Sequence, residues 1–289
     1  MKKKVAIMVD SEMGWSEKEA RQKGFNFVPI IINWNGKEGY SGVDYTLDFV
    51  YKNLNNDTVF KTSTSKIGEI QEEYRRALET AEHVLFIPIS KHLSSQVNSG
   101  KLAAENEEFK GKITVYDSEF IGPWLLSMSS ILEEMMEKDA SLEEFIEVLD
   151  LQRGNMFGWL FPKGLERLKA SGRLSKAAYL AGSLLKIVPV TPIVNGMLEA
   201  NGVIKTRSVE KALDAVVSNT IKKYHELTAK GLKVEILCTV LGEENEDFVK
   251  LQEKFKEKGF ENLGKTWLPS AIIGHVGIGG VGAGVTIKK

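Results

Sequence analysis

Val5-Ala6-Ile7-Met8-Val9 is an apolar run that ends at two short polar side chains, Asp10-Ser11. Three similar runs, rich in β-branched residues, follow in the first half of the chain: Phe27–Trp34, Val84–Ile89 and Ile113–Tyr116. Charged stretches with helical spacing, such as Ile67–Glu82, separate them. Alternation of short apolar strands with amphipathic helices predicts a parallel sheet covered by helices.

A helix-rich centre follows this first part. We expect helices at Leu125–Lys138 and Ser141–Arg153, the second opened by Ser141 and Glu144 in a capping-box pattern. The Gly/aromatic stretch 154–159 then changes the composition, so we place a boundary near residue 155. Beyond it we expect strands at Ile187–Val194, Gly202–Thr206 and Val234–Val240, with helices near Val209–Lys230 and Asn245–Lys258. The sequence thus predicts two closely packed α/β domains, residues 1–155 and 156–289.

Composition excludes several classes of protein. The chain is 43% hydrophobic and 27% charged, and its net charge of −1 gives no reason to expect a nucleic-acid partner. The basic start is followed by a short apolar run that ends at Asp10, too short for a signal peptide. No segment approaches the roughly 20 apolar residues that span a bilayer. We therefore expect a cytoplasmic protein without stable membrane insertion.

Cysteine and histidine usage argues against a metal site. Cys238 is the single cysteine, so neither an intrachain disulfide nor a cysteine-based zinc site can form. Its place in a predicted strand favours a small buried hydrophobe over a reactive thiol. No pair or cluster of histidines has the spacing of metal ligands.

Two glycine motifs match nucleotide-binding patterns in letters but not in context. Gly259–Thr266 fits G-x-x-x-x-G-K-[ST], yet a charged helix precedes it and Pro269 follows it. Gly277–Gly282 fits G-x-G-x-x-G, yet too few residues follow for the required helix and acidic residue. We expect neither motif to bind a nucleotide. The second indicates a close approach of backbone to a ligand or a neighbouring strand, or a tight glycine corner in a sheet.

Hydroxyl side chains gather in two groups, Thr62-Ser63-Thr64-Ser65 and Ser90 to Ser95. Caps and turns explain each group alone, as they explain Asp10-Ser11 and Asp117-Ser118. The alternative is ligand contact, because open α/β sheets bind ligands beyond the carboxyl ends of their strands. His275 has the same two interpretations: a hydrogen-bonded core residue, or a donor to a carboxylate.

Taken in order along the chain, these groups resemble the DegV family. The most specific match is Ser171–Lys176 followed by Gly182–Val190. Asn195-Gly196 and then Lys205-Thr206-Arg207 continue in the family's order. The resemblance extends over essentially the whole chain.

This resemblance implies a three-layer α/β/α N-terminal domain with a parallel sheet. It also implies a two-layer α/β C-terminal domain with a mixed sheet. A long-chain fatty acid would lie between or beside them, with no cofactor and no metal. The resemblance places the residues that hold the acid's carboxylate at five positions: Thr62, Ser63, Ser94, Ser95 and His275. It places glycine-rich backbone near the ligand at three more: Gly274, Gly277 and Gly279.

The family also implies a partner. In several bacteria, members present the bound acid to a separate fatty-acid kinase, and Arg173 and Arg207 match arginine positions that suit docking. As bare sequence features, such arginines are more often solvated or salt-bridged than part of a docking surface. The chain departs from the family pattern at Thr64–Ile67, at Ser95–Val97 and at Ile278.

The main alternative is an enzyme. The hydroxyls and His275 are the residue types of a nucleophile–base pair, as in an acyl hydrolase or a phosphotransferase. No third orienting group can be named from the sequence, and no G-x-S-x-G elbow is present. We therefore expect a fatty-acid-binding carrier that needs a partner for any catalysis. A purely structural module, which would bind no small molecule, is a further alternative.

Overall fold

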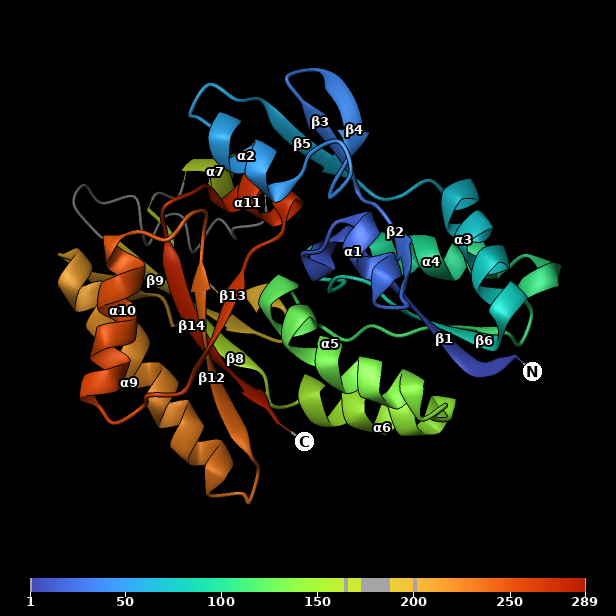
Figure 1. Ribbon diagram of the computed structural model, residues 1–289. Coiled ribbons are helices and arrows are strands. Elements are labelled where there is room, and N and C mark those ends of the chain that lie inside the picture. Colours follow the sequence, from blue (N-terminus) through green and yellow to red (C-terminus); the bar gives the residue numbers. More distant parts are fainter. Residues whose placement is uncertain (1, 164–165, 173–187, 200–201, 289) are drawn as a thin grey trace.

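The first sheet is the parallel sheet that the sequence predicts. The computed structural model describes residues 2–163, 166–172, 188–199 and 202–288 (Figure 1). Four strands form this sheet in the order β2-β1-β6-β7, and all neighbours are parallel. Their bounds are β1 (Lys3–Asp10), β2 (Asn26–Val28), β6 (Ala81–Ile87) and β7 (Ile113–Val115).

Helices cover both faces of this sheet, because side chains alternate along each strand. Ala6 and Met8 of β1 pack in one core with residues of α3 (Ile67–Thr80) and α4 (Gln96–Ala104). Val5, Ile7 and Val9 point the other way. They join a second core with α5 (Gly122–Glu137) and α6 (Leu142–Arg153). The three-layer arrangement is confirmed.

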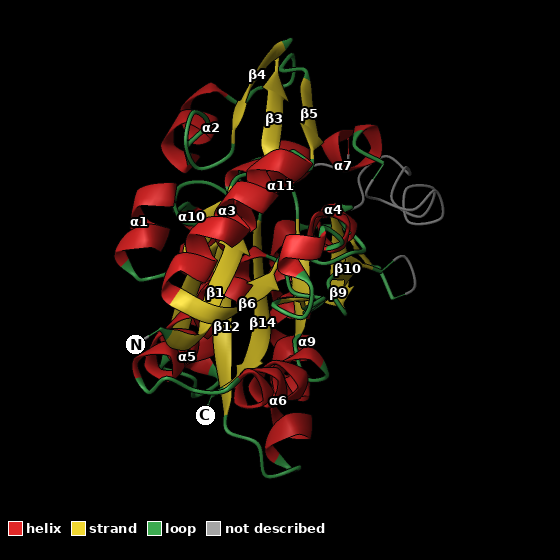
Figure 2. Cartoon of the chain, turned by 90° about the vertical axis from the view of Figure 1, so that its right-hand side faces the viewer, coloured by secondary structure: helices red, strands yellow, loops and turns green. Residues whose placement is uncertain are grey.

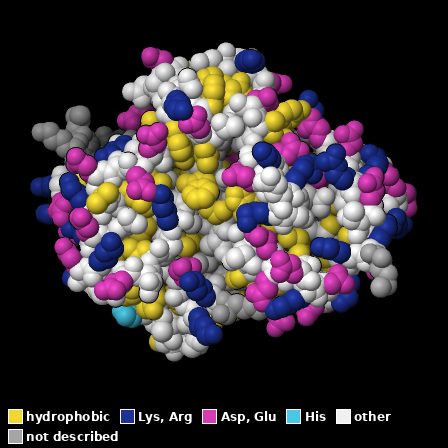
Figure 3. Space-filling view, viewed as in Figure 1, with side chains coloured by type: hydrophobic (Ala, Val, Ile, Leu, Met, Phe, Trp, Pro, Cys, Tyr) yellow, Lys and Arg dark blue, Asp and Glu magenta, His cyan; other side chains and the backbone are white. Residues whose placement is uncertain are grey.

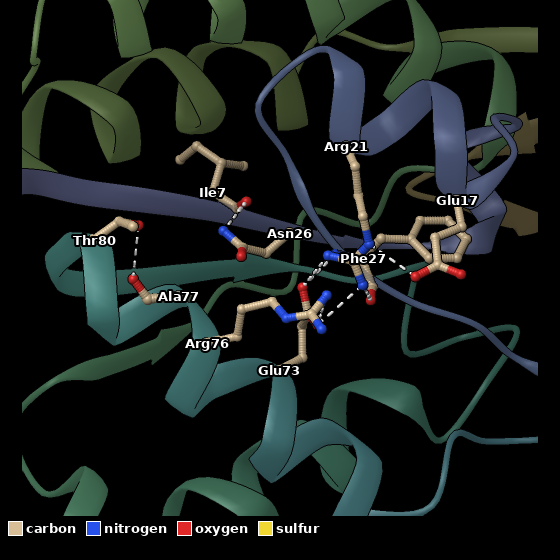
Figure 4. A network of polar contacts seen from close by, with 9 residues as sticks. All are labelled: Ile7, Glu17, Arg21, Asn26, Phe27, Glu73, Arg76, Ala77 and Thr80. Carbon is tan, nitrogen blue, oxygen red and sulfur yellow. Dashed lines mark hydrogen bonds and ion pairs between the residues drawn. The ribbon is translucent and has the colours of Figure 1, made fainter.

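A buried ion pair ties α3 to the start of the chain. Glu73 of α3 accepts two hydrogen bonds from Arg21 of α1 (Glu17–Gln22), at 2.8 and 3.1 Å, and one from the Phe27 N–H at 3.0 Å (Figure 4). Glu17 binds the same guanidinium at 2.8 Å. The pairing satisfies a carboxylate that would otherwise be costly to bury.

The predicted strand Phe27–Trp34 is wrong as a single element. It divides at Pro29, which has no N–H for a sheet ladder. Its first part is β2, whereas β3 (Ile31–Trp34) joins a separate antiparallel sheet of order β4-β3-β5. The other strands of that sheet are β4 (Lys37–Tyr40) and β5 (Phe60–Ser63), and α2 (Leu47–Asn53) lies between them in the chain. Figure 1 shows this small sheet as an upper lobe.

The second half forms the mixed sheet that the family resemblance implies. Its order is β10-β9-β8-β14-β12-β13, with β11 paired to β9. Only β12 and β13 are parallel neighbours among the described pairs. The bounds are β8 (Phe157–Phe161), β9 (Val188–Val194), β10 (Met197–Leu198), β11 (Ile204–Thr206), β12 (Val234–Val240), β13 (Leu263–Trp267) and β14 (Val281–Ile287). The buried Cys238 lies in β12, where burial raises its pKa to about 12.

Two helices cover the outer face of this sheet, α9 (Val209–Thr228) and α10 (Glu246–Glu257). Helices α5 and α6 lie against its other face, as Figures 1 and 2 show. The Trp124 indole donates to the Val285 carbonyl at 2.9 Å, and the Gln152 amide donates to the Ile287 carbonyl at 2.6 Å. One apolar core therefore continues from the parallel sheet to the mixed sheet. A division into folding units at residue 155 stays a prediction.

The glycines that follow His275 mainly allow a neighbouring strand to approach closely. A Cβ at Gly282 would lie 2.7 Å from the Trp159 carbonyl oxygen of β8, and one at Gly284 would lie 3.1 Å from the Trp124 ring. Glycine thus allows β14 to lie close to β8 and to an aromatic ring. Gly259–Thr266 runs from the end of α10 into β13, so it is not a phosphate-binding loop.

The surface carries charges of both signs, interspersed over the face seen in Figure 3. Across the described ranges, no helix is long and apolar enough to cross a membrane. No group of three metal-ligating side chains occurs in the same ranges.

Candidate ligand-binding site

An apolar cavity lies between the two parts of the chain. It holds about 710 Å³ of space free of protein atoms, part of which is open to solvent. Among the residues that the structure describes, its lining is apolar or glycine except for Glu12, Thr62, Ser94 and His275. The apolar and glycine residues are Ile30, Ile89, Leu93, Ile121, Leu160, Leu168, Ile193, Gly196, Met197, Leu198, Leu268, Ala271, Ile272 and Val276. Such a cavity suits a long apolar molecule with a polar end.

Thr62 and His275 meet at one wall of this cavity. Thr62 lies on β5, and His275 lies in the last turn of α11 (Ser270–Val276). The Thr62 hydroxyl and the His275 Nε2 share a hydrogen bond of 2.9 Å, although 213 positions separate them in the chain. The imidazole is 9% exposed and packs edge-on against Phe60, 5.0 Å between ring centres. The sequence predicted both residues for the site, and the structure brings them together.

A polar recess adjoins this end of the cavity. The recess and the cavity share Thr62, Leu93 and Ser94. Ser63 and Ser95, both exposed, line the recess but not the cavity, together with Thr64, Lys91 and His92. A carboxylate held at Thr62 and Ser94 would therefore have a water-accessible, hydroxyl-rich side.

Ser65 and Gln96, two positions that depart from the family pattern, are hydrogen-bonded to each other. The Gln96 side-chain amide donates to the Ser65 hydroxyl at 2.7 Å, and its carbonyl oxygen accepts from the Ser65 N–H at 3.1 Å. Ser65 in turn donates to the Pro29 carbonyl at 2.7 Å. Both side chains are buried, so this pair holds the hydroxyl-rich segment Thr62–Ser65 in place relative to the segment Ser90–Ser95.

The three glycines near His275 each have a structural role, and none of them lines the cavity. A Cβ on Gly274 would overlap the Phe60 ring, so glycine allows α11 to approach β5. Gly277 and Gly279 have φ of 90° and 87°, where glycine is favoured. The glycine that does line the cavity is Gly196, at the tip of the β9–β10 hairpin.

Arg167 of α7 (Glu166–Ala170) lies at the polar end of the cavity, where it contacts α11. Its guanidinium donates to the Gly274 carbonyl at 3.1 Å and contacts the carbonyl of Asn55. Burial lowers its pKa from the usual value, but an arginine stays charged. Of the two arginines predicted for docking, Arg207 is exposed after β11, and Arg173 lies outside the described residues.

The polar pairs at the strand ends form a helix cap at Asp10 and turns at Asp117 and Ser118. Asp10 accepts from the N–H groups of Glu12 and Ile89 at 3.0 and 2.9 Å. Ser118 accepts from the Phe120 N–H at 3.2 Å, and Asp117 pairs with Lys91 at 2.9 Å. These contacts support the structural interpretation of both pairs.

Glu12, two residues after β1, is the polar lining residue that the sequence patterns did not predict. It is 1% exposed, and burial together with the nearby Asp10 carboxylate raises its pKa to about 8. Hydrogen bonds from the hydroxyls of Ser11 and Ser41 oppose that shift. The folded protein therefore keeps this carboxyl protonated at neutral pH.

The Glu12 shift predicts a pH-dependent stability. Between about pH 4.5 and pH 8 the unfolded chain releases this proton while the folded chain keeps it, so the free energy of unfolding falls as pH rises. Glu12→Gln should remove this contribution, and its stability relative to wild type should rise by a few kcal/mol from pH 5 to pH 9. Urea denaturation across this range measures it. The exposed Glu72→Gln is the control, and a pH-independent difference for Glu12→Gln would show that Glu12 is ionised when folded.

The fold and the cavity together define an α/β protein that encloses an apolar pocket with a polar end. A family model described as "Uncharacterised protein, DegV family" matches residues 4–288, and the chain belongs to the DegV family. A DegV domain-containing protein of Deinococcus radiodurans is 27% identical over 279 residues, covering 96% of each chain.

Solved structures agree with this assignment. A DegV family protein from Thermus thermophilus, described by its fatty-acid binding, has a TM-score of 0.84 at 26% identity and covers 99% of this chain and 100% of that one. A DegV lipid-binding protein from Thermotoga maritima has a TM-score of 0.76 at 25% identity, covering 99% of both chains.

Proposed function

We propose that this protein binds one long-chain fatty acid and presents its carboxyl group to a separate fatty-acid kinase. The observation that supports fatty-acid binding is an apolar cavity whose polar end brings together Thr62, Ser94 and His275. The relatives from Thermus and Thermotoga, described as binding fatty acid and lipid, support it.

The energetics fit this ligand. Each buried CH₂ group contributes about 0.8 kcal/mol, so the acyl chain supplies most of the affinity. A carboxylate taken from water must recover its lost hydration, and charge-assisted hydrogen bonds from hydroxyls and an imidazole do so. When the acid binds, the hydrogen bond between Thr62 and His275 breaks, so that the Thr62 and Ser94 hydroxyls and the His275 Nε2–H can each donate to the carboxylate oxygens.

A titration of delipidated protein tests the binding proposal. Affinity for saturated fatty acids should increase with chain length until the cavity is full. Methyl hexadecanoate should bind at least about tenfold more weakly than hexadecanoate, because the ester has lost the charged head group. Equal affinity for acid and ester would contradict a carboxylate site. Product formation from acyl esters or acyl phosphates by the purified protein alone would favour the enzyme alternative.

The polar recess supports the kinase part of the proposal. It leaves one side of the head-group position open to a partner, beside Ser63, Ser95 and Lys91. Arg207 would contribute to docking through its exposed charge.

Arg207→Ala should lower phosphorylation of the bound acid by a fatty-acid kinase about tenfold while leaving fatty-acid affinity unchanged. Acyl-phosphate formation in a reconstituted assay measures this. Lys205→Ala removes a nearby exposed charge and is the matched control. Equal rates for both variants would remove Arg207 from the docking surface.

A further inference from the structure

The wall of the acyl cavity contains one carboxyl group that the proposed function does not use. Glu12 lies in the short helix η1 (Ser11–Met13) and lines the cavity beside apolar residues such as Ile272 and Ala271. The group is almost fully buried, at 1% exposure. An acyl chain of CH₂ groups offers it no partner.

The two oxygens of this carboxyl differ in their contacts. Oε1 accepts from the Ser11 hydroxyl at 3.2 Å and from the Ser41 hydroxyl at 3.3 Å. Oε2 is buried and has no hydrogen-bond partner in the described part of the chain. The backbone N–H of Ile272 faces the carboxyl and opposes the rise of its pKa, but it makes no hydrogen bond to Oε2. Burying a polar atom without a hydrogen-bond partner costs free energy. A ligand that supplies the missing hydrogen bond should therefore bind more tightly than one that does not.

The protonation state of Glu12 defines that partner. Its raised pKa of about 8 keeps the carboxyl neutral at pH 7, so it can donate one hydrogen bond as well as accept. An alcohol also donates and accepts, which makes it complementary to a neutral carboxyl.

The position of Glu12 in the cavity indicates which part of the ligand would carry the alcohol group. Ile272, its neighbour in the cavity wall, precedes His275 by three residues on α11, or about 4.5 Å along the helix. A polar group within the first few carbons of the acyl chain would therefore be close to Glu12 while the carboxylate is at His275.

We propose that the cavity selects a fatty acid with a hydroxyl group near its carboxyl end, and that Glu12 is the residue that recognises this hydroxyl. The inference rests on the fatty-acid binding proposed above. A site built to hydrogen-bond a ligand hydroxyl discriminates against the analogue that lacks it, because its own polar group is then left buried and unpaired.

Binding of three acids to the delipidated full-length protein tests this: hexadecanoic, 3-hydroxyhexadecanoic and 16-hydroxyhexadecanoic acid. The wild type should bind the 3-hydroxy acid about tenfold more tightly than the unsubstituted acid. The 16-hydroxy acid should bind no more tightly than hexadecanoic acid, since its hydroxyl is remote from Glu12. Glu12→Met, which keeps a similar side-chain length without a polar atom, should abolish the preference, and Glu12→Gln should retain part of it.

Equal wild-type affinity for hexadecanoic and 3-hydroxyhexadecanoic acid would overturn the inference, and this comparison needs no variant to fold. A preference that persists unchanged in Glu12→Met would overturn it as well. Failure of all three acids to bind would instead contradict the fatty-acid proposal itself. Tight binding of hexadecanoic acid without any preference would leave that proposal standing and remove only the hydroxyl site.

Discussion

Replacing His275 by alanine should weaken fatty-acid binding by about ten- to hundredfold, the range for loss of a hydrogen bond to a charged group. The ring is buried against Phe60 and shares a hydrogen bond with Thr62, so its Nε2 edge is held at the polar end of the cavity. Alanine would also leave the ligand carboxylate with one hydrogen bond fewer on the side that faces the apolar cavity. Displacement of a fluorescent fatty acid from the purified protein measures the loss.

Two further variants sharpen this experiment. Thr62→Val keeps the shape of the side chain but removes the hydroxyl, and we expect a smaller loss in the same direction. His225→Ala removes an exposed histidine from α9, outside the cavity lining, and should leave the affinity unchanged. Wild-type affinity in His275→Ala would remove this histidine from the head-group site.

Gly196→Ala should destabilise the protein by about 3–5 kcal/mol, because backbone strain and overpacking act at one position. Gly196 has φ of 68° and closes the β9–β10 hairpin with Asn195 at φ of 50°. An added Cβ would overlap the Glu119 carbonyl oxygen and lie 2.6 Å from the Ser90 hydroxyl. The hairpin would have to move away from the N-terminal part, and Met197 and Leu198 of the cavity wall would move with it.

The chain contains a matched control for this variant. Asn35-Gly36 closes the β3–β4 hairpin with φ of 50° and 88°, and nothing lies within 4 Å of a Cβ added there. Gly36→Ala should therefore cost only the backbone strain, about 1–2 kcal/mol. Urea denaturation gives both free energies of unfolding. Equal losses would show that the surroundings of Gly196 relax without cost.

Local patterns in the sequence predicted much of the fold. The capping box of Ser141 and Glu144 is present at the start of α6, and β12 has the predicted bounds, Val234–Val240. The parallel sheet and the mixed sheet are both confirmed. The prediction of one strand over Phe27–Trp34 was wrong because hydrophobicity alone does not show the break at Pro29. The residues before and after this proline belong to different sheets. The dipeptide Asn35-Gly36 is a typical hairpin turn, and it could have predicted the β3–β4 hairpin from the sequence.

The site was predictable only in part, because its residues meet through tertiary packing. Resemblance to a family singled out Thr62, Ser94 and His275, and all three line the cavity. Glu12 was not predicted as a cavity residue, because the polar residues at that strand end were interpreted as a cap formed by Asp10 and Ser11. Only the structure shows that the next side chain lies in an apolar wall. The role of Gly196 was hidden for the same reason, since the Glu119 carbonyl that requires it is remote in sequence.

The small molecules that the purified protein carries test fatty-acid binding most directly. Protein purified without delipidation should be denatured and the released small molecules identified by mass spectrometry. We predict a near-stoichiometric long-chain fatty acid, whose mass also reports its chain length and any hydroxyl group. A protein that releases no fatty acid, and that takes up none when long-chain acids are added, would contradict the account.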